Sequence, residues 1–223
     1  MDFSLRWNDD RPLSRARRVF MAAGLAALLA GCAGAGATRE RHLFYLHGAI
    51  IEQQGPRAVS ERFGSYDYAG ILGKFREGDL QVHSETRPKD TDVDAYARKV
   101  AAEIEDLIQD GVPPSHITVV GASKGAVIAT LVSARLRNPN VRYVLMAACN
   151  DWLIETHDPR LSGEVLSIYE QSDEIAGSCK AVADRSPDVA RYEEIRLDTG
   201  LGHGFLYRPL TAWVAPAVRW AKR

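Results

Sequence analysis

The sequence lacks several features that define particular classes of protein. It has no long, strongly apolar run of the kind that spans a membrane, because the main apolar segment, 19–30, holds only about 12 residues. Its basic residues form no stripe or patch and its formal net charge is −1, so nucleic acid is not an expected partner. No group of His, Cys and Asp has the spacing of a zinc site, and we expect neither a metal nor another cofactor.

The first 31 residues are organised like an export signal. Arg15 to Arg18 form a basic start, and the apolar segment that follows has the length of a signal-peptide core. Arg17 and Arg18 also fit a twin-arginine signal, so the general secretory route and the twin-arginine route both remain open.

The apolar segment ends in Leu29-Ala30-Gly31-Cys32, which resembles the bacterial lipobox. The resemblance implies that Cys32 receives a diacylglyceryl group and becomes the new N-terminus. The exported protein would then be lipid-anchored in the cell envelope, on the periplasmic side of the outer membrane. The alternative is an ordinary signal peptide, cut near 35 or 37, which would discard Cys32.

Cysteine is scarce elsewhere, because the chain has only Cys149 and Cys179 besides Cys32. Export would place these two residues in an oxidising compartment, where a disulfide is permitted. A Cys149–Cys179 bridge and two buried free thiols both fit the sequence.

With 1–31 as the signal and 32–40 as a short tether, residues 41–223 predict one domain of alternating strands and helices. Fully apolar runs are typical of parallel strands that helices cover on both faces. The expected fold class is therefore α/β, an open, mostly parallel, helix-flanked sheet with its active site at the carboxyl ends of the strands. Strands are predicted at 42–46, 80–84, 117–120, 141–147, 164–169 and 192–197, and helices at 68–75, 92–110, 124–137 and 209–222.

The sharpest motif is Gly121-Ala122-Ser123-Lys124-Gly125. It lies between an apolar strand and a helix, as the G-x-S-x-G nucleophile elbow requires. A nucleophilic serine must stand on a tight turn, and glycines on both sides let strand and helix close around it. The motif therefore predicts Ser123 as a nucleophile.

A serine hydroxyl becomes reactive when a base takes its proton. His203 is flanked by glycines in the loop after the last predicted strand, where such a base is expected. Asp173, just past the strand at 164–169, is the predicted carboxylate that orients His203. Glu174 and Asp151 are alternatives for that role, because each also follows a strand.

The turn His47-Gly48-Ala49 follows the first predicted strand and is similar to the His-Gly motif of α/β hydrolases. Together with the elbow and the chain order Ser123, Asp173, His203, it gives 41–221 a resemblance to the α/β-hydrolase superfamily. The resemblance implies an oxyanion hole built from the backbone N–H of Lys124 and that of Ala49 or Gly48, with His47 supporting the turn. Only 152–163 could form a cap, so a minimal cap and a small, open site are implied.

Several other polar residues near these motifs have more than one interpretation. Lys124 could act with the serine, but as a neighbour on a helix start it is expected to be a surface lysine. Arg87 and Lys89 could bind an anionic substrate group or pair with nearby aspartates, and pairing is favoured. Tyr66 and Tyr68 could line an acyl pocket or pack on the sheet.

The sequence therefore predicts a carboxylesterase-like serine hydrolase that cleaves an ester or thioester through Ser123, His203 and Asp173. Its expected partners are a small-molecule or lipid-like acyl substrate and, through the N-terminal anchor, a membrane. One alternative keeps the same residues but cleaves a peptide or amide. Another is a non-catalytic envelope binding protein with the same fold, since fold alone does not establish activity.

Overall fold

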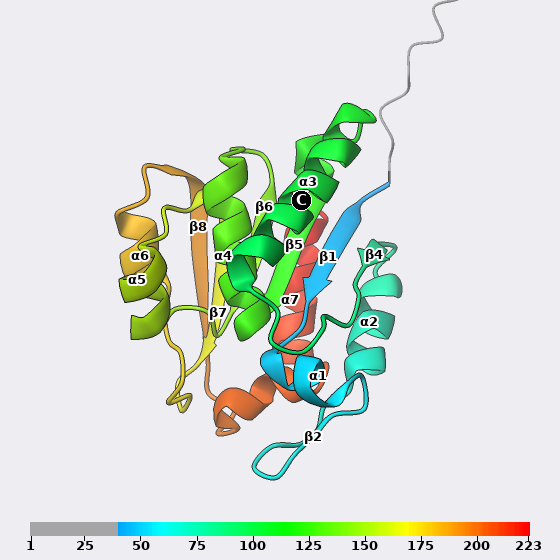
Figure 1. The fold of residues 1–223 in the computed structure, drawn as a ribbon, viewed down its shortest axis with the longest axis vertical. Helices are drawn as coiled ribbons and strands as arrows, with labels where there is room; N and C mark the ends of the chain where they lie inside the picture. Colours follow the sequence, from blue (N-terminus) through cyan, green and yellow to red (C-terminus); the bar gives the residue numbers. More distant parts are fainter. Residues whose placement is uncertain (1–39) are drawn as a thin grey trace, which may run out of the picture. The chain divides into compact units, whose positions relative to one another are not determined.

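The computed structural model describes residues 40–223. Their centre is a sheet of six strands in which every neighbouring pair is parallel, in the order β4-β1-β5-β6-β7-β8 (Figure 1). The prediction of an α/β fold with a helix-flanked, mostly parallel sheet is confirmed. The strands are β1 (His42–Leu46), β4 (Gln81–His83), β5 (Ile117–Ala122), β6 (Arg142–Met146), β7 (Ser162–Glu170) and β8 (Asp188–Leu197).

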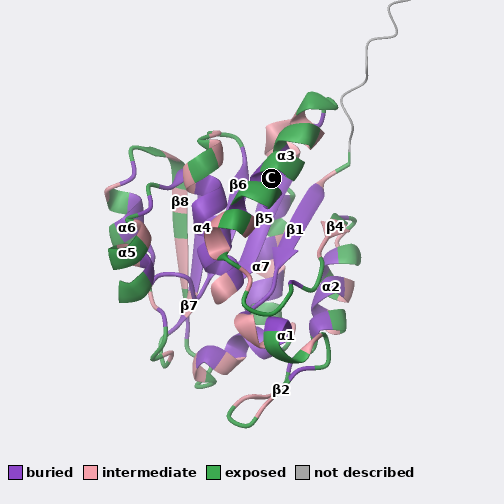
Figure 2. Cartoon of the chain, viewed as in Figure 1, coloured by how far each residue is buried: buried purple, intermediate pink, exposed green. Residues whose placement is uncertain are grey.

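Helices cover both faces of the sheet because successive strand residues point to opposite sides. Phe44 and Leu46 of β1 belong to an apolar cluster that also contains residues of α3, α4, α5 and α6, whereas Leu43 and Tyr45 belong to a cluster with residues of α1, α2 and α7. Figure 2 shows the central strands buried between these two layers. The helices are α1 (Ala49–Gln54), α2 (Tyr68–Arg76), α3 (Val93–Gln109), α4 (Lys124–Leu136), α5 (Asp151–His157), α6 (Lys180–Asp184) and α7 (Thr211–Ala221).

The predicted strands and long helices are all present, with small differences at their ends. The largest difference is at β8, which begins at Asp188 rather than at 192. The sequence did not predict the short elements: α1, α5, α6 and the hairpin of β2 (Val59–Ser60) and β3 (Gly64–Ser65). Segments this short show too few residues for a hydrophobic period, and their stability comes from packing on the rest of the domain.

The strand order reverses direction beside β1, which makes this place the topological switch point of the sheet. Strand β1 has β4 on one side and β5 on the other, so the connections after β1 and β5 diverge at the carboxyl ends of these strands. His47-Gly48 follows β1 and Ser123 follows β5, so both predicted motifs lie at this crevice. Residues 40 and 41 enter β1 at the opposite, amino edge of the sheet (Figure 1).

The predicted export signal, the lipobox and residues 32–39 of the predicted 32–40 tether lie outside the described residues and stay predictions. Within 40–223, no helix combines the length and the apolar character needed to cross a membrane.

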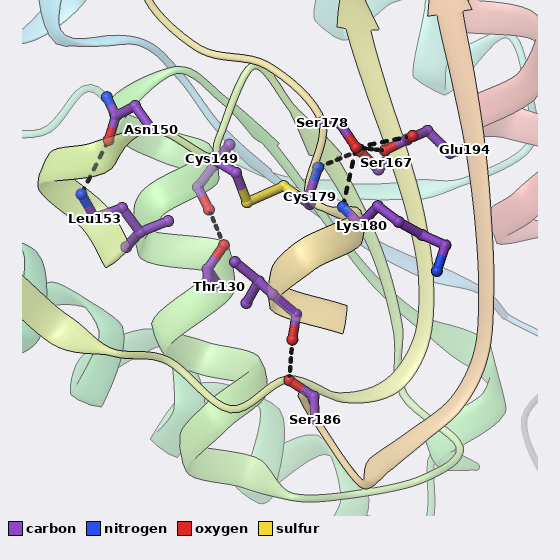
Figure 3. Close-up of a disulfide and its surroundings, with 12 residues drawn as sticks. Thr130, Cys149, Asn150, Leu153, Ser167, Ser178, Cys179, Lys180, Ser186 and Glu194 are labelled. Atoms are coloured by element: carbon purple, nitrogen blue, oxygen red, sulfur yellow. Dashed lines mark hydrogen bonds between the residues drawn. A yellow bond between two sulfur atoms is a disulfide. The ribbon is translucent and has the colours of Figure 1, made fainter. Parts of the chain in front are cut away.

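Cys149 and Cys179 form a disulfide, which decides between the two alternatives left by the sequence. Cys149 follows β6, Cys179 directly precedes α6, and both are buried. Figure 3 shows the bond between these two segments. The N–H of Gly177, which lies in the second segment, also donates to the carbonyl of Cys149 at 2.9 Å. The disulfide therefore fixes the connection after β7 to the connection after β6.

Replacing Cys149 and Cys179 by serine is expected to lower the free energy of unfolding by about 2–4 kcal/mol, because the bridge restricts a loop of the unfolded chain. Urea unfolding of the oxidised wild type and of the double variant measures the difference. Reduced wild-type protein is the control and should match the variant. Equal unfolding midpoints for the oxidised and reduced proteins would contradict the expectation.

Candidate active site

Ser123 lies on a sharp turn between β5 and α4. Its backbone has φ 53° and ψ −121°, a conformation that residues with a side chain rarely adopt. The turn is possible because its neighbours are glycines. A Cβ on Gly121 would lie 2.4 Å from the carbonyl oxygen of Gly125, and one on Gly125 would lie 1.9 Å from that of Leu46. The turn thus brings α4 against the end of β1 and leaves the Ser123 side chain at the sheet edge.

His203 lies in the short helix η2 (Gly202–Tyr207), after β8, and its ring is largely buried. Its Nε2 is 2.9 Å from the Oγ of Ser123, and its Nδ1 is 2.7 Å from the Oδ2 of Asp173. An ionised carboxylate only accepts hydrogen bonds, so the ring proton belongs on Nδ1 and Nε2 can accept the serine proton. The structure therefore brings the three predicted side chains together in the order Ser123, His203, Asp173.

Asp173 is the carboxylate at His203, and its two rivals are not. The Asp173 side chain has no exposed surface, and its second oxygen accepts the N–H of Ile175 at 2.9 Å. Glu174 points to solvent and pairs with Arg62 at 3.3 Å, while Asp151 is an exposed residue at the start of α5. Adjacent residues in a turn face different ways, which a sequence alone does not resolve.

A second carboxylate, Glu170 at the end of β7, holds the two loops together. It accepts the N–H of Thr199 at 2.9 Å, the Thr199 hydroxyl at 2.7 Å and the Ser172 hydroxyl at 3.1 Å. Burial disfavours its charge, but the hydrogen bonds from Thr199 and Ser172 outweigh burial and hold the pKa of this carboxyl below its usual value. Glu170 thus joins the Asp173 loop to the segment that leads to His203. No local motif in the sequence marks Glu170 for this role.

The turn after β1 lies directly against the serine. A Cβ on Gly48 would be 3.6 Å from the Cβ of Ser123. The N–H of Gly48 interacts with the Tyr66 hydroxyl. The N–H groups of Ala49 and Lys124 open helices α1 and α4, where the first turn has no partner inside the helix, and neither donates to another described residue. Ala49 and Lys124 are thus the N–H pair available beside Ser123.

A cavity of about 240 Å³ opens beside Ser123. Its walls are mainly apolar, and Trp152 of α5 is 51% exposed there. Helix α5 covers the first half of the segment 152–163 predicted to form a cap, but it is short, and Gly163 at the end of that segment belongs to β7. The lining residues are Val93, Ser123, Lys124, Val127, Ala147, Ala148, Asn150, Trp152 and Ile175.

Two expectations about basic residues were wrong. Arg87 is buried and pairs through Nε with Glu52 at 2.6 Å, not with one of the nearby aspartates. The Nζ of Lys124 lies 2.6 Å from the other Glu52 oxygen, and its side chain is only 23% exposed. Both expectations failed because the sequence did not predict helix α1, which places the Glu52 carboxylate within hydrogen-bonding distance of both side chains. Lys89 is exposed, as a surface residue would be.

Both tyrosines in question pack in the core rather than line the cavity. The Tyr66 hydroxyl lies 2.7 Å from that of Tyr45, and the Tyr68 hydroxyl lies 2.8 Å from that of Ser84. Burial raises the pKa of Tyr66 to about 12. Both phenols therefore stay neutral hydrogen-bonding groups at ordinary pH.

His47 is buried beneath the turn it precedes. Its Nε2 accepts the N–H of Arg87 at 3.0 Å, and its Nδ1 lies 2.9 Å from the carbonyl of Gly48. Burial, reinforced by the neighbouring Arg87 guanidinium, lowers the pKa of His47 to about 4. The ring is thus neutral near pH 7, and its contacts match a supporting role for the turn.

Within residues 40–223, no three or more His, Cys, Asp or Glu side chains are grouped to hold a metal ion. The sequence matches no protein-family model and no curated protein.

Several solved structures share the fold. SOBER1 from Arabidopsis thaliana has a TM-score of 0.54 and 12% identity, with 82% of this chain and 98% of that chain covered. Est1E from Butyrivibrio proteoclasticus has a TM-score of 0.55 and 13% identity, covering 82% and 88%. An arylesterase has a TM-score of 0.57 and 13% identity, covering 83% and 77%. At these identities the likeness shows the fold alone, which this chain shares with α/β hydrolases.

The low pKa of His47 predicts a loss of stability in acid. Unfolding frees the ring, which then takes up a proton near its ordinary pKa of 6.5, while the folded ring resists protonation until about pH 4. The contribution of the neutral His47 ring to the free energy of unfolding is therefore complete above pH 6.5. It declines by about 3 kcal/mol as the pH falls to 4.

Urea unfolding of the wild type and of His47→Asn, measured at several pH values from 7 to 4, tests this expectation. Asparagine offers a donor and an acceptor but no titrating ring, so its stability should fall less steeply than that of the wild type. Parallel curves for the two proteins would show that His47 does not titrate as described.

Proposed function

We propose that the protein is a serine hydrolase that cleaves an ester or thioester through an acyl-enzyme. The observation that carries the proposal is the continuous hydrogen-bonded series from Ser123 Oγ to His203 Nε2 and from His203 Nδ1 to the buried Asp173. A hydroxyl, a correctly oriented imidazole and a carboxylate in this order are the parts that activate a serine nucleophile. The cavity beside Ser123 supplies room for a substrate.

In the proposed reaction, His203 takes the Ser123 proton while Oγ attacks the carbonyl carbon. The negatively charged oxygen of the tetrahedral intermediate accepts hydrogen bonds from the N–H groups of Ala49 and Lys124. His203 then gives the proton to the leaving alcohol or thiol as the C–O or C–S bond breaks. Water, deprotonated by His203, attacks the acyl-enzyme, and the proton returns to Ser123 as the acid leaves. Asp173 keeps the imidazole oriented and stabilises its charged form.

The first test is labelling of the purified domain, residues 33–223, with a fluorophosphonate probe. The wild type should be labelled at Ser123, whereas Ser123→Ala and His203→Ala should not. Asp173→Asn should slow ester turnover on the order of 10⁴-fold, because the amide favours the wrong tautomer of His203.

Glu174→Gln is the matched control, since this neighbouring carboxylate faces solvent and should retain full activity. A folded wild-type protein that is neither labelled nor active on esters would contradict the proposal and favour a binding protein. Turnover of amides but not esters would favour the peptidase or amidase alternative.

The size of the cavity predicts a preference for short acyl groups. A volume of about 240 Å³ equals that of about eight water molecules, which suits an acyl chain of roughly two to six carbons. Each buried methylene should raise kcat/KM about fourfold, the equivalent of ~0.8 kcal/mol, until the cavity is filled. Beyond that length kcat/KM should stop rising.

A series of nitrophenyl esters from acetate to dodecanoate measures this dependence. Trp152→Ala removes one apolar wall and should reduce the gain per methylene without changing turnover of acetate. A steady increase of kcat/KM up to dodecanoate would contradict the assignment of the cavity as the acyl site.

A further inference from the structure

Glu52 forms a buried ionic cluster with Arg87 and Lys124. One carboxylate oxygen accepts the Nε of Arg87 at 2.6 Å, and the other accepts the Nζ of Lys124 at 2.6 Å. The side chains of Glu52 and Arg87 are 3% and 0% exposed. We call this cluster the Glu52 bridge.

The Glu52 bridge joins the two segments that carry the available N–H groups beside Ser123. At one end, Arg87 donates through its side chain to the carbonyl of His47 and through its backbone to the His47 ring, so it holds the turn that leads to Ala49. At the other end is Lys124, the residue directly after Ser123. Glu52 is itself on α1, the helix that Ala49 opens.

Stability alone gives little reason for such a cluster. Removing charges from water is costly, and a buried ion pair is often no more stabilising than apolar residues of the same volume. The cluster also carries two cations and one anion, a formal charge of +1, and the Nη1 of Arg87 has no hydrogen-bond partner among the described residues. Its position between the two N–H donors points to a role in their alignment.

We propose that Glu52 is a positioning residue that holds the N–H groups of Ala49 and Lys124 in register around the developing oxyanion. The inference rests on the proposed function. An oxyanion donor is effective only when it is aimed at the position that the charged oxygen will occupy. Two donors on separate segments therefore need a fixed connection. Glu52 connects them because it binds Arg87, which holds the turn before Ala49, and also binds the side chain of Lys124.

If Glu52 acted only through its charge, its replacement by glutamine would have the opposite effect on the rate from the one that alignment predicts. Glu52→Gln removes a negative charge near the oxyanion and raises the formal charge of the cluster to +2. If field strength alone mattered, the variant would be as fast as the wild type or faster. If alignment matters, the variant is slower, because the neutral amide cannot bind both cations as the carboxylate does.

The experiment compares Glu52→Gln, the double variant Glu52→Gln/Lys124→Met, and the wild type on a short-chain ester. Rates are normalised to the Ser123 sites titrated with a fluorophosphonate, so that loss of folded protein does not count. We expect kcat to fall about 10- to 100-fold in Glu52→Gln, which is a smaller loss than removal of a whole oxyanion donor causes. KM should stay within about twofold of the wild-type value. The double variant restores the formal charge of +1 but not the bridge, and it should be equally slow.

A boronic acid, which adds to Ser123 and places an oxygen in the hole, gives a second measurement. Glu52→Gln should weaken its binding by a factor similar to the loss of kcat, while binding of a ground-state amide analogue is unchanged. Glu193→Gln is the control, because Glu193 also pairs with an arginine, Arg223, but lies on β8 away from the lining of the Ser123 cavity. Its kinetics should match those of the wild type.

Three outcomes would overturn the inference: an unchanged or higher kcat in Glu52→Gln, recovery of kcat in the double variant, or equal weakening of boronate and amide binding. None of them affects the proposed function, which fails if the wild type itself turns over no ester. If Glu52→Gln does not fold, Lys124→Met breaks the bridge at its partly exposed end, and a kcat equal to that of the wild type would also overturn the inference.

Discussion

The arrangement of the site depends on one steric constraint, the close approach of α4 to the end of β1. At Gly125 a single added carbon would lie 1.9 Å from the carbonyl oxygen of Leu46. Helix and strand can meet this closely only where the side chain is a hydrogen atom. Ser123, two residues before Gly125, has a positive φ, and its Cβ lies against the turn at Gly48. Groups that come from distant parts of the chain thus converge at one crevice.

The sequence predicted those parts of the site whose signals are local. Ser123 is identified by glycines two positions on either side, and His203 by its place after the last strand. Both are properties of a few consecutive residues and of the strand order. Glu52, by contrast, acts on residues 35 and 72 positions away. Its helix is too short to show a hydrophobic period, so neither the helix nor its contacts could be read from the pattern, and Arg87 and Lys124 were misinterpreted as a result.

The loops around the site are fixed by different kinds of bond. The Asp173 loop is joined to the segment before His203 by hydrogen bonds to Glu170, and farther along it is tied by the disulfide at Cys179. The turn at Gly48 is held by an ionic cluster. Hydrogen bonds to a buried carboxylate and a covalent bridge both limit motion without help from a large apolar core at the sheet edge. A small domain can in this way keep loop residues within the narrow distances that proton transfer requires.

The direction of β1 separates the crevice from the point at which the chain enters the domain. The polypeptide joins the sheet at the amino end of β1, and the crevice with Ser123 is at the carboxyl end, about 16 Å farther along a five-residue strand. A molecule can therefore reach Ser123 without passing the point at which the chain enters the sheet.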